Sequence, residues 1–325
     1  MIIVRAPLRI TLGGGGSDLQ SFSSKHGGFC ISAAIDKYIY ISIHRTYQEE
    51  IILKYSQMEH VSKADEIKHP IIRECIKYLE FKTPQLEITS HADVPSNGSG
   101  LGSSGAFSVA LLKALYAHRN IPILPDTIAE LACHINMDVL GMIQGKQDEY
   151  ISSLGGIMCL TFEEDGSVIH EPLNISHETL VDLEENLMLF YTGINHNTNN
   201  ILKEQEEKTR SEDKDIINNL LQLKEIGYAS KKILEMGGMD SFAQLLNMQW
   251  KNKEARTPTT PFIQEVRKGA LENGALGMKL VGSGVGGFLA SYANDKKKLR
   301  TYMKTKGLEE LRFKFDFQGT QVLAK

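Results

Sequence analysis

Residues 93–112 constrain the fold most, because a glycine-rich loop there runs directly into a helical segment. Gly98, Gly100 and Gly102 tolerate positive φ angles and let a ligand approach the backbone without meeting a Cβ atom. Residues 106–117 favour a helix, whose first N–H groups would lack partners and would carry the positive end of the helix dipole. This arrangement predicts a phosphate-binding loop, although an ordinary turn before a buried helix shows the same pattern.

A chain of 325 residues is too long for one ordinary hydrophobic core, so we expect two domains, 1–180 and 181–325. The net charge of −4 favours binding neither to nucleic acid nor to an anionic membrane. No segment approaches the roughly 18 apolar residues of a membrane span, and the start of the chain has no signal-peptide pattern. We therefore expect a cytoplasmic protein. Its four cysteines lie far apart, which favours buried thiols over a metal or redox motif.

Hydrophobic periodicity predicts a protein that mixes helices and strands. Strands are expected at residues 2–12, 29–43, 49–54, 85–91, 157–162, 187–191 and 311–323. Helices are expected at residues 67–80, 106–117, 126–141 and 299–303, and long helical sequence after residue 191 extends to about residue 253. Pro7 restricts the first strand to a sheet edge or a bulge.

Two further glycine-rich loops occur, at residues 13–18 and 280–288. The earlier one ends in Asp18, so it can offer backbone N–H groups and a carboxylate to a hydroxylated or phosphorylated ligand. The later one has the glycine spacing of a dinucleotide-binding fingerprint, but a strand-like segment follows it where that fingerprint needs a helix.

Two other phosphate-handling patterns fit poorly. A nucleotide P-loop at residues 141–146 is one residue short, and Gln147 stands where that motif needs a magnesium-binding Ser or Thr. The motif set of the protein kinases is absent from the sequence. If this chain transfers phosphate, it uses another fold.

Taken together, three motifs resemble those of the GHMP small-molecule kinases, a family named after galactokinase, homoserine kinase, mevalonate kinase and phosphomevalonate kinase. They lie at residues 5–18, 94–104 and 279–287, and Gly145-Lys146-Gln147-Asp148 accompanies them. The resemblance spans nearly the whole chain. It implies an α+β protein with the two-domain GHMP kinase architecture: a mixed-sheet N-terminal domain, a ferredoxin-like C-terminal domain and an active site in the cleft between them.

The resemblance also implies roles for individual residues. Asp148 matches the catalytic aspartate, and Arg9 matches the basic residue that pairs with it. A carboxylate near the acceptor hydroxyl can orient it and take its proton, while an arginine spreads charge away from the transferring phosphoryl group. A purely structural ion pair between the two is the alternative. The residues expected to bind ATP are Pro95, Gly98, Gly100, Leu101, Gly102, Ser103, Ser104, Gly282 and Gly284.

Members of the family hold Mg²⁺ with the serine of the second motif, here Ser104, and with a glutamate on the following helix. Counting twelve residues back from Asp148 leads to Asn136, whose neutral carbonyl oxygen is a poorer magnesium ligand than a carboxylate. Asp138 lies roughly 200° away around a helix and cannot simply replace it. We expect Ser104 and Asn136 as metal ligands, with more of the coordination coming from ATP and water.

The acceptor is suggested by the first motif. Galactokinases carry Glu-His where this chain has Gly15 and Gly16, which opens space for a longer sugar or a terminal phosphate. This motif and residues 27–39 resemble the D-glycero-D-manno-heptose 7-phosphate kinases. That likeness implies phosphorylation of the anomeric C1 hydroxyl to give the 1,7-bisphosphate, for nucleotide-activated heptose and surface polysaccharide. The expected substrate-binding residues are Arg5, Gly15, Gly16, Ser17, Asp18, Lys37, Lys146 and Gln147.

Arg5, Lys37 and Lys146 are the candidate cations for the 7-phosphate, although each would by default be a solvated surface side chain. The alternatives are a kinase for L-fucose or galactose, a catalytically weak ligand sensor suggested by Asn136, and a decarboxylase of the mevalonate-diphosphate type. The expected partners are a small sugar phosphate and ATP, with neither nucleic acid nor membrane. A homo-oligomer is compatible with the sequence.

Overall fold

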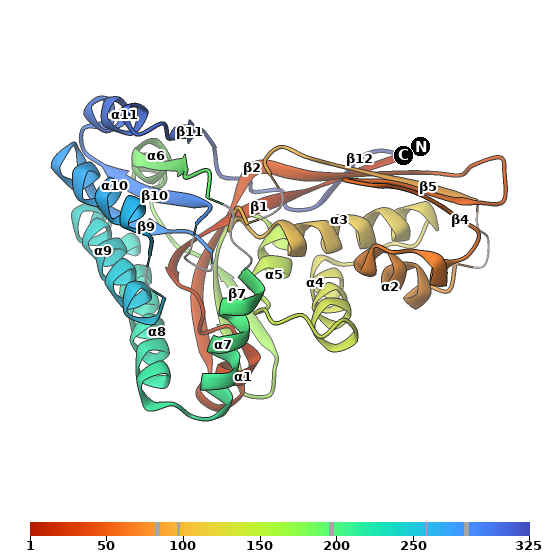
Figure 1. Cartoon of the computed structure of the whole chain (residues 1–325), viewed down its shortest axis with the longest axis horizontal. Coiled ribbons are helices and arrows are strands. Elements are labelled where there is room, and N and C mark those ends of the chain that lie inside the picture. Colours follow the sequence, from red (N-terminus) through yellow and green to blue (C-terminus); the bar gives the residue numbers. More distant parts are fainter. Residues whose placement is uncertain (82–84, 96–97, 195–197, 258, 283–285) are drawn as a thin grey trace.

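The computed structural model describes residues 1–81, 85–95, 98–194, 198–257, 259–282 and 286–325, and it contains two sheets (Figure 1). The first sheet is mixed and contains β1 (Ile2–Gly14), β2 (Gly28–His44), β3 (Ile51–Lys54), β4 (Met58–Val61), β5 (Leu86–Ala92), β6 (Ile157–Phe162), β7 (Val168–Pro172) and β12 (Gln321–Ala324). The second sheet contains β8 (Leu187–Tyr191), β9 (Ala275–Leu280), β10 (Phe288–Ala293) and β11 (Glu309–Leu311).

The α-helices are α1 (Gln20–His26), α2 (Pro70–Tyr78), α3 (Ser103–His118), α4 (Pro125–Cys133), α5 (Gln147–Leu154), α6 (His177–Asn186), α7 (Thr198–Arg210), α8 (Lys214–Glu235), α9 (Met239–Arg256), α10 (Pro261–Glu272) and α11 (Lys296–Thr305). A short 3₁₀ helix spans Ala64–Glu66, and α4 continues into a π-helical turn at His134–Val139. The strands and helices predicted from periodicity are largely present, but helices α1, α5, α6 and α10 lie outside the predicted helical segments.

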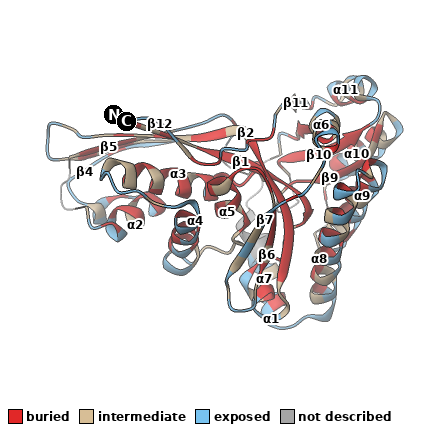
Figure 2. Cartoon of the chain, turned by 180° about the vertical axis from the view of Figure 1, so that it is seen from behind, coloured by how far each residue is buried: buried red, intermediate tan, exposed pale blue. Residues whose placement is uncertain are grey.

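The long strands β1 and β2 form the centre of the first sheet. They pair along almost their whole length, and the pairing shifts register between Pro7 and Leu8, so the bulge expected at Pro7 is present. Strand β2 pairs with β6 through its first half and with β5 through its second half. Helices α3 and α8 both contact β1 and β2, and buried residues line β1, β2 and β6 (Figure 2). This double cover explains why these strands are apolar on both faces.

The second sheet has the ferredoxin-like topology that the family resemblance implies. Its strands follow one another spatially as β11-β8-β10-β9, which is the order 4-1-3-2 of a β-α-β-β-α-β unit. Helix α9 packs on β9, and the core beneath it contains Trp250, Phe190 and Met278. The two-domain α+β architecture is therefore confirmed, and the functional motifs lie where the two sheets meet.

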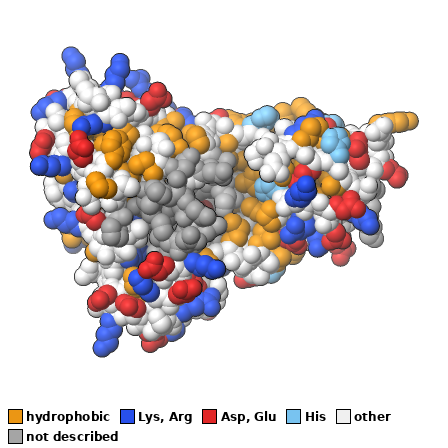
Figure 3. Space-filling model, viewed as in Figure 1, with side chains coloured by type: hydrophobic (Ala, Val, Ile, Leu, Met, Phe, Trp, Pro, Cys, Tyr) orange, Lys and Arg blue, Asp and Glu red, His pale blue; other side chains and the backbone are white. Residues whose placement is uncertain are grey.

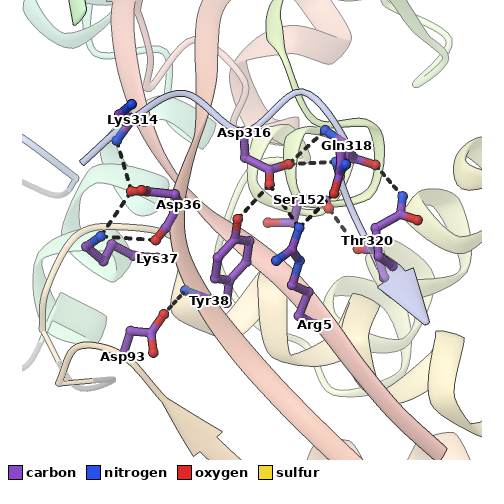
Figure 4. A network of polar contacts seen from close by, with 12 residues as sticks. Arg5, Asp36, Lys37, Tyr38, Asp93, Ser152, Lys314, Asp316, Gln318 and Thr320 are labelled. Atoms are coloured by element: carbon purple, nitrogen blue, oxygen red, sulfur yellow. Dashed lines mark hydrogen bonds and ion pairs between the residues drawn. The ribbon is translucent and has the colours of Figure 1, made fainter. Parts of the chain in front are cut away.

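The prediction of one strand over residues 311–323 is wrong. After β11 the chain runs irregularly until β12, because the carboxylate of Asp316 accepts hydrogen bonds from the N–H groups of Gln318 and Gly319 and holds a turn (Figure 4). Strand β12 then pairs with β1 in the first sheet, which places the two chain ends side by side (Figure 1). The last strand thus lies with the first sheet, although the predicted division assigns it to the domain 181–325.

Three further observations bear on the predicted class of protein. All four cysteines are buried and free, as expected. Among the described residues, no helix is long and apolar enough to cross a membrane. Lysine and arginine side chains intermingle with aspartate and glutamate over the face shown in Figure 3.

Candidate active site

An ion pair between Arg9 and Asp148 joins β1 to the first turn of α5. Arg9 Nε lies 2.6 Å from Asp148 Oδ1, and the guanidinium also donates to the carbonyl oxygen of Gly100. The backbone N–H of Arg9 donates to the carbonyl oxygen of Leu101 at 2.9 Å. The Arg9 side chain is 6% exposed and the Asp148 side chain is 22% exposed, so the carboxylate is the more accessible partner.

The second glycine loop packs its backbone directly against this pair. Gly102 precedes α3 with a φ of +77°, and a Cβ atom there would lie 3.1 Å from Cγ of Asp148 and from Cγ of Arg9. A Cβ atom at Gly105 would lie 2.7 Å from Cβ of Asp148. The N-terminus of α3 therefore meets the Asp148 carboxylate because neither position carries a side chain.

The other ATP-binding residues predicted on this loop occupy different environments. Ser103 is buried and its Oγ lies 3.3 Å from Oγ of Ser99, whereas Ser104 is exposed at the start of α3. Pro95 is exposed and Leu101 is fully buried. Leu101 therefore contributes packing and its carbonyl group, while the hydroxyl of Ser104 is accessible to a ligand.

The third glycine loop rests on the second. Gly100 and Gly282 have φ angles of +74° and +71°, and a Cβ atom on Gly282 would collide with the backbone of Gly100. A Cβ atom on Gly100 would lie 2.7 Å from the carbonyl oxygen of Val281, and one on Gly287 would collide with the carbonyl oxygen of Ser99. Gly98 also contacts Gly287, through its carbonyl oxygen. The predicted ATP contact Gly284 lies outside the described residues.

The first glycine loop and Asp18 face the same region. Gly14, Gly15 and Gly16 all have positive φ angles, and the N–H of Gly16 donates to Oδ1 of Asp18 at 2.9 Å. A Cβ atom on Gly145 would collide with the Asp18 carboxylate, which places this acid beside the segment that leads to Asp148. Burial raises the pKa of Asp18, and the negative charge of Asp148 raises it further.

These elements enclose a cavity of about 160 Å³. The cavity is bordered by both carboxylates, by the first glycine loop and by side chains of the second domain. The lining includes Arg9, Thr11, Gly14, Gly15, Gly16, Asp18, Gln147, Asp148, Gln205, Gln249, Lys253, Arg256, Lys279 and Gly282. Two acids and four cations therefore face one enclosed space. The predicted residue Gln147 lines it and accepts a hydrogen bond from Thr11 Oγ1 at 2.8 Å.

Three of those cations, Lys253, Arg256 and Lys279, are absent from the sequence-based site. Burial lowers the pKa of Lys279 to about 7 and that of Arg256 to about 10. Burial also lowers the pKa of Lys253, and repulsion from Arg256, Lys279 and Arg9 adds to this effect. Two sequence signals were available: Gln249, Lys253 and Arg256 follow the i, i+4, i+7 spacing of one helix face, and Lys279 interrupts an otherwise apolar strand.

Several predicted substrate-binding residues are used elsewhere. Ser17 is fully buried, and its hydroxyl donates to the carbonyl oxygen of Phe29 at 3.0 Å. Lys146 Nζ lies 3.0 Å from Glu130 Oε2 and 2.7 Å from the carbonyl oxygen of Gly166, and it borders a separate cavity. The hydroxyl of Ser17 thus fixes the loop to β2, and the charge of Lys146 is already paired.

Arg5 and Lys37 belong to a polar network that anchors the C-terminal segment (Figure 4). The guanidinium of Arg5 stacks 4.3 Å from the ring of Tyr38 and donates to Gln318 Oε1 at 2.7 Å. Lys37 Nζ lies 3.0 Å from Asp36 Oδ1. Of the three cations predicted for a distal phosphate, none lines the cavity between the carboxylates, among the residues that the structure describes.

The predicted metal ligand Asn136 is enclosed in a hydrogen-bonded chain. Its Oδ1 accepts from Ser108 Oγ at 3.0 Å, and its Nδ2 donates to Glu149 Oε1 at 2.9 Å. The other oxygen of Glu149 is buried and has no hydrogen-bond partner among the residues that the structure describes, and burial raises the pKa of this carboxyl to about 7. Within the described ranges, no three His, Cys, Asp or Glu side chains gather as a metal site. A metal here would depend largely on ligands from outside the protein.

Comparisons with known proteins agree with this geometry. The family model for the N-terminal domain of the GHMP kinases matches residues 70–156, and the model for their C-terminal domain matches residues 229–306. The D-glycero-alpha-D-manno-heptose 7-phosphate kinase of Campylobacter jejuni is 29% identical over 311 residues, with 91% of each chain covered. The two family models include Gly100, Asp148 and Gly282, and the alignment with the Campylobacter jejuni protein covers most of the chain.

Solved structures give the same result. A D-glycero-D-manno-heptose 1-phosphate kinase from Bacteriodes thetaiotaomicron superimposes with a TM-score of 0.82 at 25% identity, covering 100% of this chain and 99% of that one. The galactokinase of Lactococcus lactis, solved with galactose, gives a TM-score of 0.79 at 14% identity, covering 99% and 95%. The second likeness shows a shared fold.

Proposed function

This chain belongs to the GHMP kinases, and we propose that it transfers the γ-phosphoryl group of ATP to the anomeric hydroxyl of a phosphorylated sugar. The acceptor that we propose is D-glycero-D-manno-heptose 7-phosphate, and the product would be its 1,7-bisphosphate. Two of the most similar proteins are named as kinases of heptose phosphates. The observation that carries the proposal is the cavity in which Asp148, paired with Arg9, faces Asp18 and the open loop of Gly15 and Gly16.

In this proposal Asp148 handles the proton. Its carboxylate accepts a hydrogen bond from the acceptor hydroxyl, orients that oxygen towards the γ-phosphorus and takes its proton as the new P–O bond forms and the β–γ bridge breaks. Arg9 offsets the negative charge that develops on the transferring group. Because the transition state is loose, holding the two reactants in line contributes more than proton abstraction does.

The triphosphate would occupy the start of α3. The first N–H groups of this helix and the left-handed backbone at Gly100 and Gly102 provide donors for phosphate oxygens. Gly282 supports that loop from the second domain. Asp18, which lines the same cavity as Asp148, would accept hydrogen bonds from ring hydroxyls of the sugar.

Magnesium fits this site only with few protein ligands. Ser104 presents an exposed hydroxyl, whereas both ends of the Asn136 amide already have partners. Mg²⁺ commonly keeps several waters and binds substrate phosphates, so one hydroxyl is compatible with it. When bound, the ion would neutralise charge on the β- and γ-phosphates.

The test is a panel of sugars and sugar phosphates incubated with magnesium and ATP, scored by ADP release, with the phosphorylated position assigned by phosphorus NMR. We expect turnover with heptose 7-phosphate and a new signal from a C1 phosphate. The Asp148→Asn variant, which preserves the shape of the side chain, should lose most of this activity.

Other outcomes would redirect the assignment. Turnover of L-fucose or galactose alone would keep the kinase class and change the substrate. Binding of nucleotide and sugar without any turnover would favour a ligand sensor, which the closed environment of Asn136 makes the second candidate.

A further inference from the structure

The cavity beside Asp148 has an excess of positive charge. Arg9 is paired with Asp148, but Lys253, Arg256 and Lys279 also border the space, and Asp18 is the other acid in its lining. The amine of Lys279 donates to Gln249 Oε1 at 2.7 Å, and that of Lys253 donates to backbone carbonyl oxygens of Leu280 and Gly282. These partners are neutral, so they leave both positive charges uncompensated.

Arg256 is the least satisfied of these cations. Its Nε and Nη1 atoms are buried without a hydrogen-bond partner among the described residues. Taking an unpaired charge of this kind out of water is unfavourable. The guanidinium is a planar fork of donors, which matches the oxygens of a phosphate monoester better than a single lysine does. Its arrangement therefore fits a site completed by an anionic ligand.

Two neighbours add to this donor set. A Cβ atom on Gly16 would lie 3.3 Å from Nη1 of Arg256, so no side chain at this position separates the buried guanidinium from the first loop. Gln205 of α7 lines the same cavity, and its Nε2 atom is also buried without a hydrogen-bond partner in the described parts of the chain. A guanidinium and an amide, both with unused donors, thus border one space.

The position of Arg256 distinguishes an acceptor phosphate from a phosphate of ATP. Arg256 lies next to Gly16 of the first loop, since a Cβ atom on Gly16 would be 3.3 Å from its Nη1, and Gly16 is two residues from Asp18. The start of α3, where the triphosphate is placed in the proposed function, packs on Asp148 through Gly102 and Gly105. The anion at Arg256 therefore belongs to the acceptor's side of the carboxylate.

We propose that Arg256, together with Gln205 and the space above Gly16, forms a subsite for a phosphate group carried by the acceptor sugar. This inference rests on the proposed function and relocates the distal phosphate from Arg5, Lys37 and Lys146 to the second domain. The subsite selects sugar phosphates over neutral sugars, because a neutral sugar leaves the buried guanidinium unpaired.

The experiment compares Arg256→Gln and Arg256→Lys with wild type, using heptose 7-phosphate and unphosphorylated heptose as acceptors. Arg256→Gln should raise KM for the sugar phosphate roughly 10- to 100-fold, the loss of a charged hydrogen-bonding group. It should change kcat/KM for the neutral sugar by less than about threefold, and Arg256→Lys should recover part of the loss. Titration with ADP should give the wild-type Kd in both variants.

Arg267→Gln is the matched control. Within the described ranges, Arg267 also has a buried Nε without a hydrogen-bond partner, but it stacks on Trp250 at 4.9 Å and lies outside the cavity lining. It should keep the wild-type KM values. Equal losses for both sugars in Arg256→Gln would overturn the subsite, and a loss confined to ADP binding would assign the anion to the nucleotide.

The subsite can be tested separately from the proposed function, because binding of a sugar phosphate can be measured without turnover. If wild type turns over no sugar, calorimetric titration with heptose 7-phosphate and with mannose 6-phosphate still tests the subsite. Weaker binding of these sugar phosphates to Arg256→Gln than to wild type supports it, and equal or absent binding to both proteins overturns it.

Discussion

Arg9 and Asp148 lie 139 positions apart in the sequence, yet Arg9 Nε is 2.6 Å from Asp148 Oδ1. The same guanidinium reaches the carbonyl oxygen of Gly100, so one side chain from β1 ties the first turn of α5 to the glycine loop before α3. The carboxylate is held at the helix N-terminus by contacts that do not depend on a substrate.

Asp148→Asn should lower kcat roughly 10²- to 10⁴-fold, since the amide keeps the contact geometry but cannot accept the proton. Arg9→Gln should also lower kcat, and the double variant should lose far less than the product of the two single losses, because the residues act as a pair. Steady-state kinetics on the four proteins measures this coupling. Strictly multiplicative losses would contradict a shared role.

Gly282→Ala should separate the second and third loops. A Cβ atom there meets the backbone of Gly100, which has no flexible side chain to yield, and the residue also has a φ of +71°. We expect kcat/KM for ATP to fall roughly 10²-fold, as expected for reacting groups displaced by about 1 Å.

Gly307→Ala provides the matched control for Gly282→Ala. Gly307 has a φ of +73°, and apart from its chain neighbours no heavy atom of the described residues lies within 4 Å of the position that a Cβ atom would take. Both variants should lose about 1–2 kcal/mol of stability from backbone strain, which thermal denaturation measures. Only Gly282→Ala should lose activity, and an equal loss in Gly307→Ala would refute the loop contact.

The three glycine loops could be predicted from the sequence because their chemistry is local. Where the backbone needs positive φ, or where a Cβ atom would collide with a neighbour, the sequence has glycine at that position. Gly100 and Gly282 meet both conditions. The order of the three glycine motifs along the chain also led to the prediction of the two-domain fold, through the family resemblance. What the sequence could not supply is the direct contact between these two glycines, which only the packing of the second domain creates.

The cations that α9 contributes to the cavity, unlike the glycine loops, could not be assigned to the site from the sequence. Lys251 and Lys253 are two residues apart on the charge-rich helix α9, but Lys251 is exposed while Lys253 borders the cavity. Composition cannot distinguish them, because the difference is set by which face of α9 turns towards the first domain. Arg256 was absent from the sequence-based site for the same reason: the sequence does not show which face of α9 turns towards the first domain.

Lys37, a predicted phosphate ligand close in sequence to the first motif, does not line the cavity formed by the described residues. It follows the first motif on β2, but the pairing of β1 with β2 passes from Pro7 opposite Tyr38 to Leu8 opposite Ile35, so Asp36 and Lys37 have no partners on β1. In this bulge Lys37 turns to the carboxylate of Asp36. A break in strand pairing of this kind leaves little trace in the alternation of apolar residues.

Glu149 should make the protein less stable as the pH rises towards neutral. An unfolded glutamate ionises near pH 4.5, but burial raises the pKa of Glu149 in the folded protein to about 7, and the charge of Asp148 adds to this. The folded state therefore binds the extra proton between these values, and the associated stability, about 3 kcal/mol, is complete below pH 4.5 and lost through pH 7. Glu149→Gln should remove that loss in urea titrations with EDTA and without nucleotide.

Glu59→Gln is a control of opposite sign. Burial opposes ionisation of Glu59, but hydrogen bonds from the N–H groups of Lys68 and His69 and from Tyr55 outweigh it and lower the pKa. The stability contributed by this carboxylate is therefore lost as the pH falls, and Glu59→Gln should flatten the acidic limb of the profile. An unchanged neutral limb in Glu149→Gln would disprove the assignment to that residue.

Binding of a sugar phosphate should be accompanied by proton uptake. Burial lowers the pKa of Lys279 to about 7, and the charge of Arg9 acts in the same direction, so most of this amine is neutral at pH 8 before the ligand binds. A phosphate dianion in the cavity favours the ammonium form and pulls the proton from solvent, up to about 0.9 proton at this site. The phosphate itself, with a second pKa of about 6, is already ionised at pH 8 and takes up little.

Calorimetry in two buffers of different ionisation enthalpy measures this uptake at pH 8. Lys279→Met should reduce it, while the contribution of Lys253, whose pKa burial also lowers, should persist. Lys306→Met is the control, because Lys306 is partnered with Glu265 at 2.6 Å and lies outside the cavity lining. Equal proton uptake by wild type and Lys279→Met would mean that the phosphate does not reach Lys279, since a dianion close enough to pair with a neutral buried amine must raise its pKa.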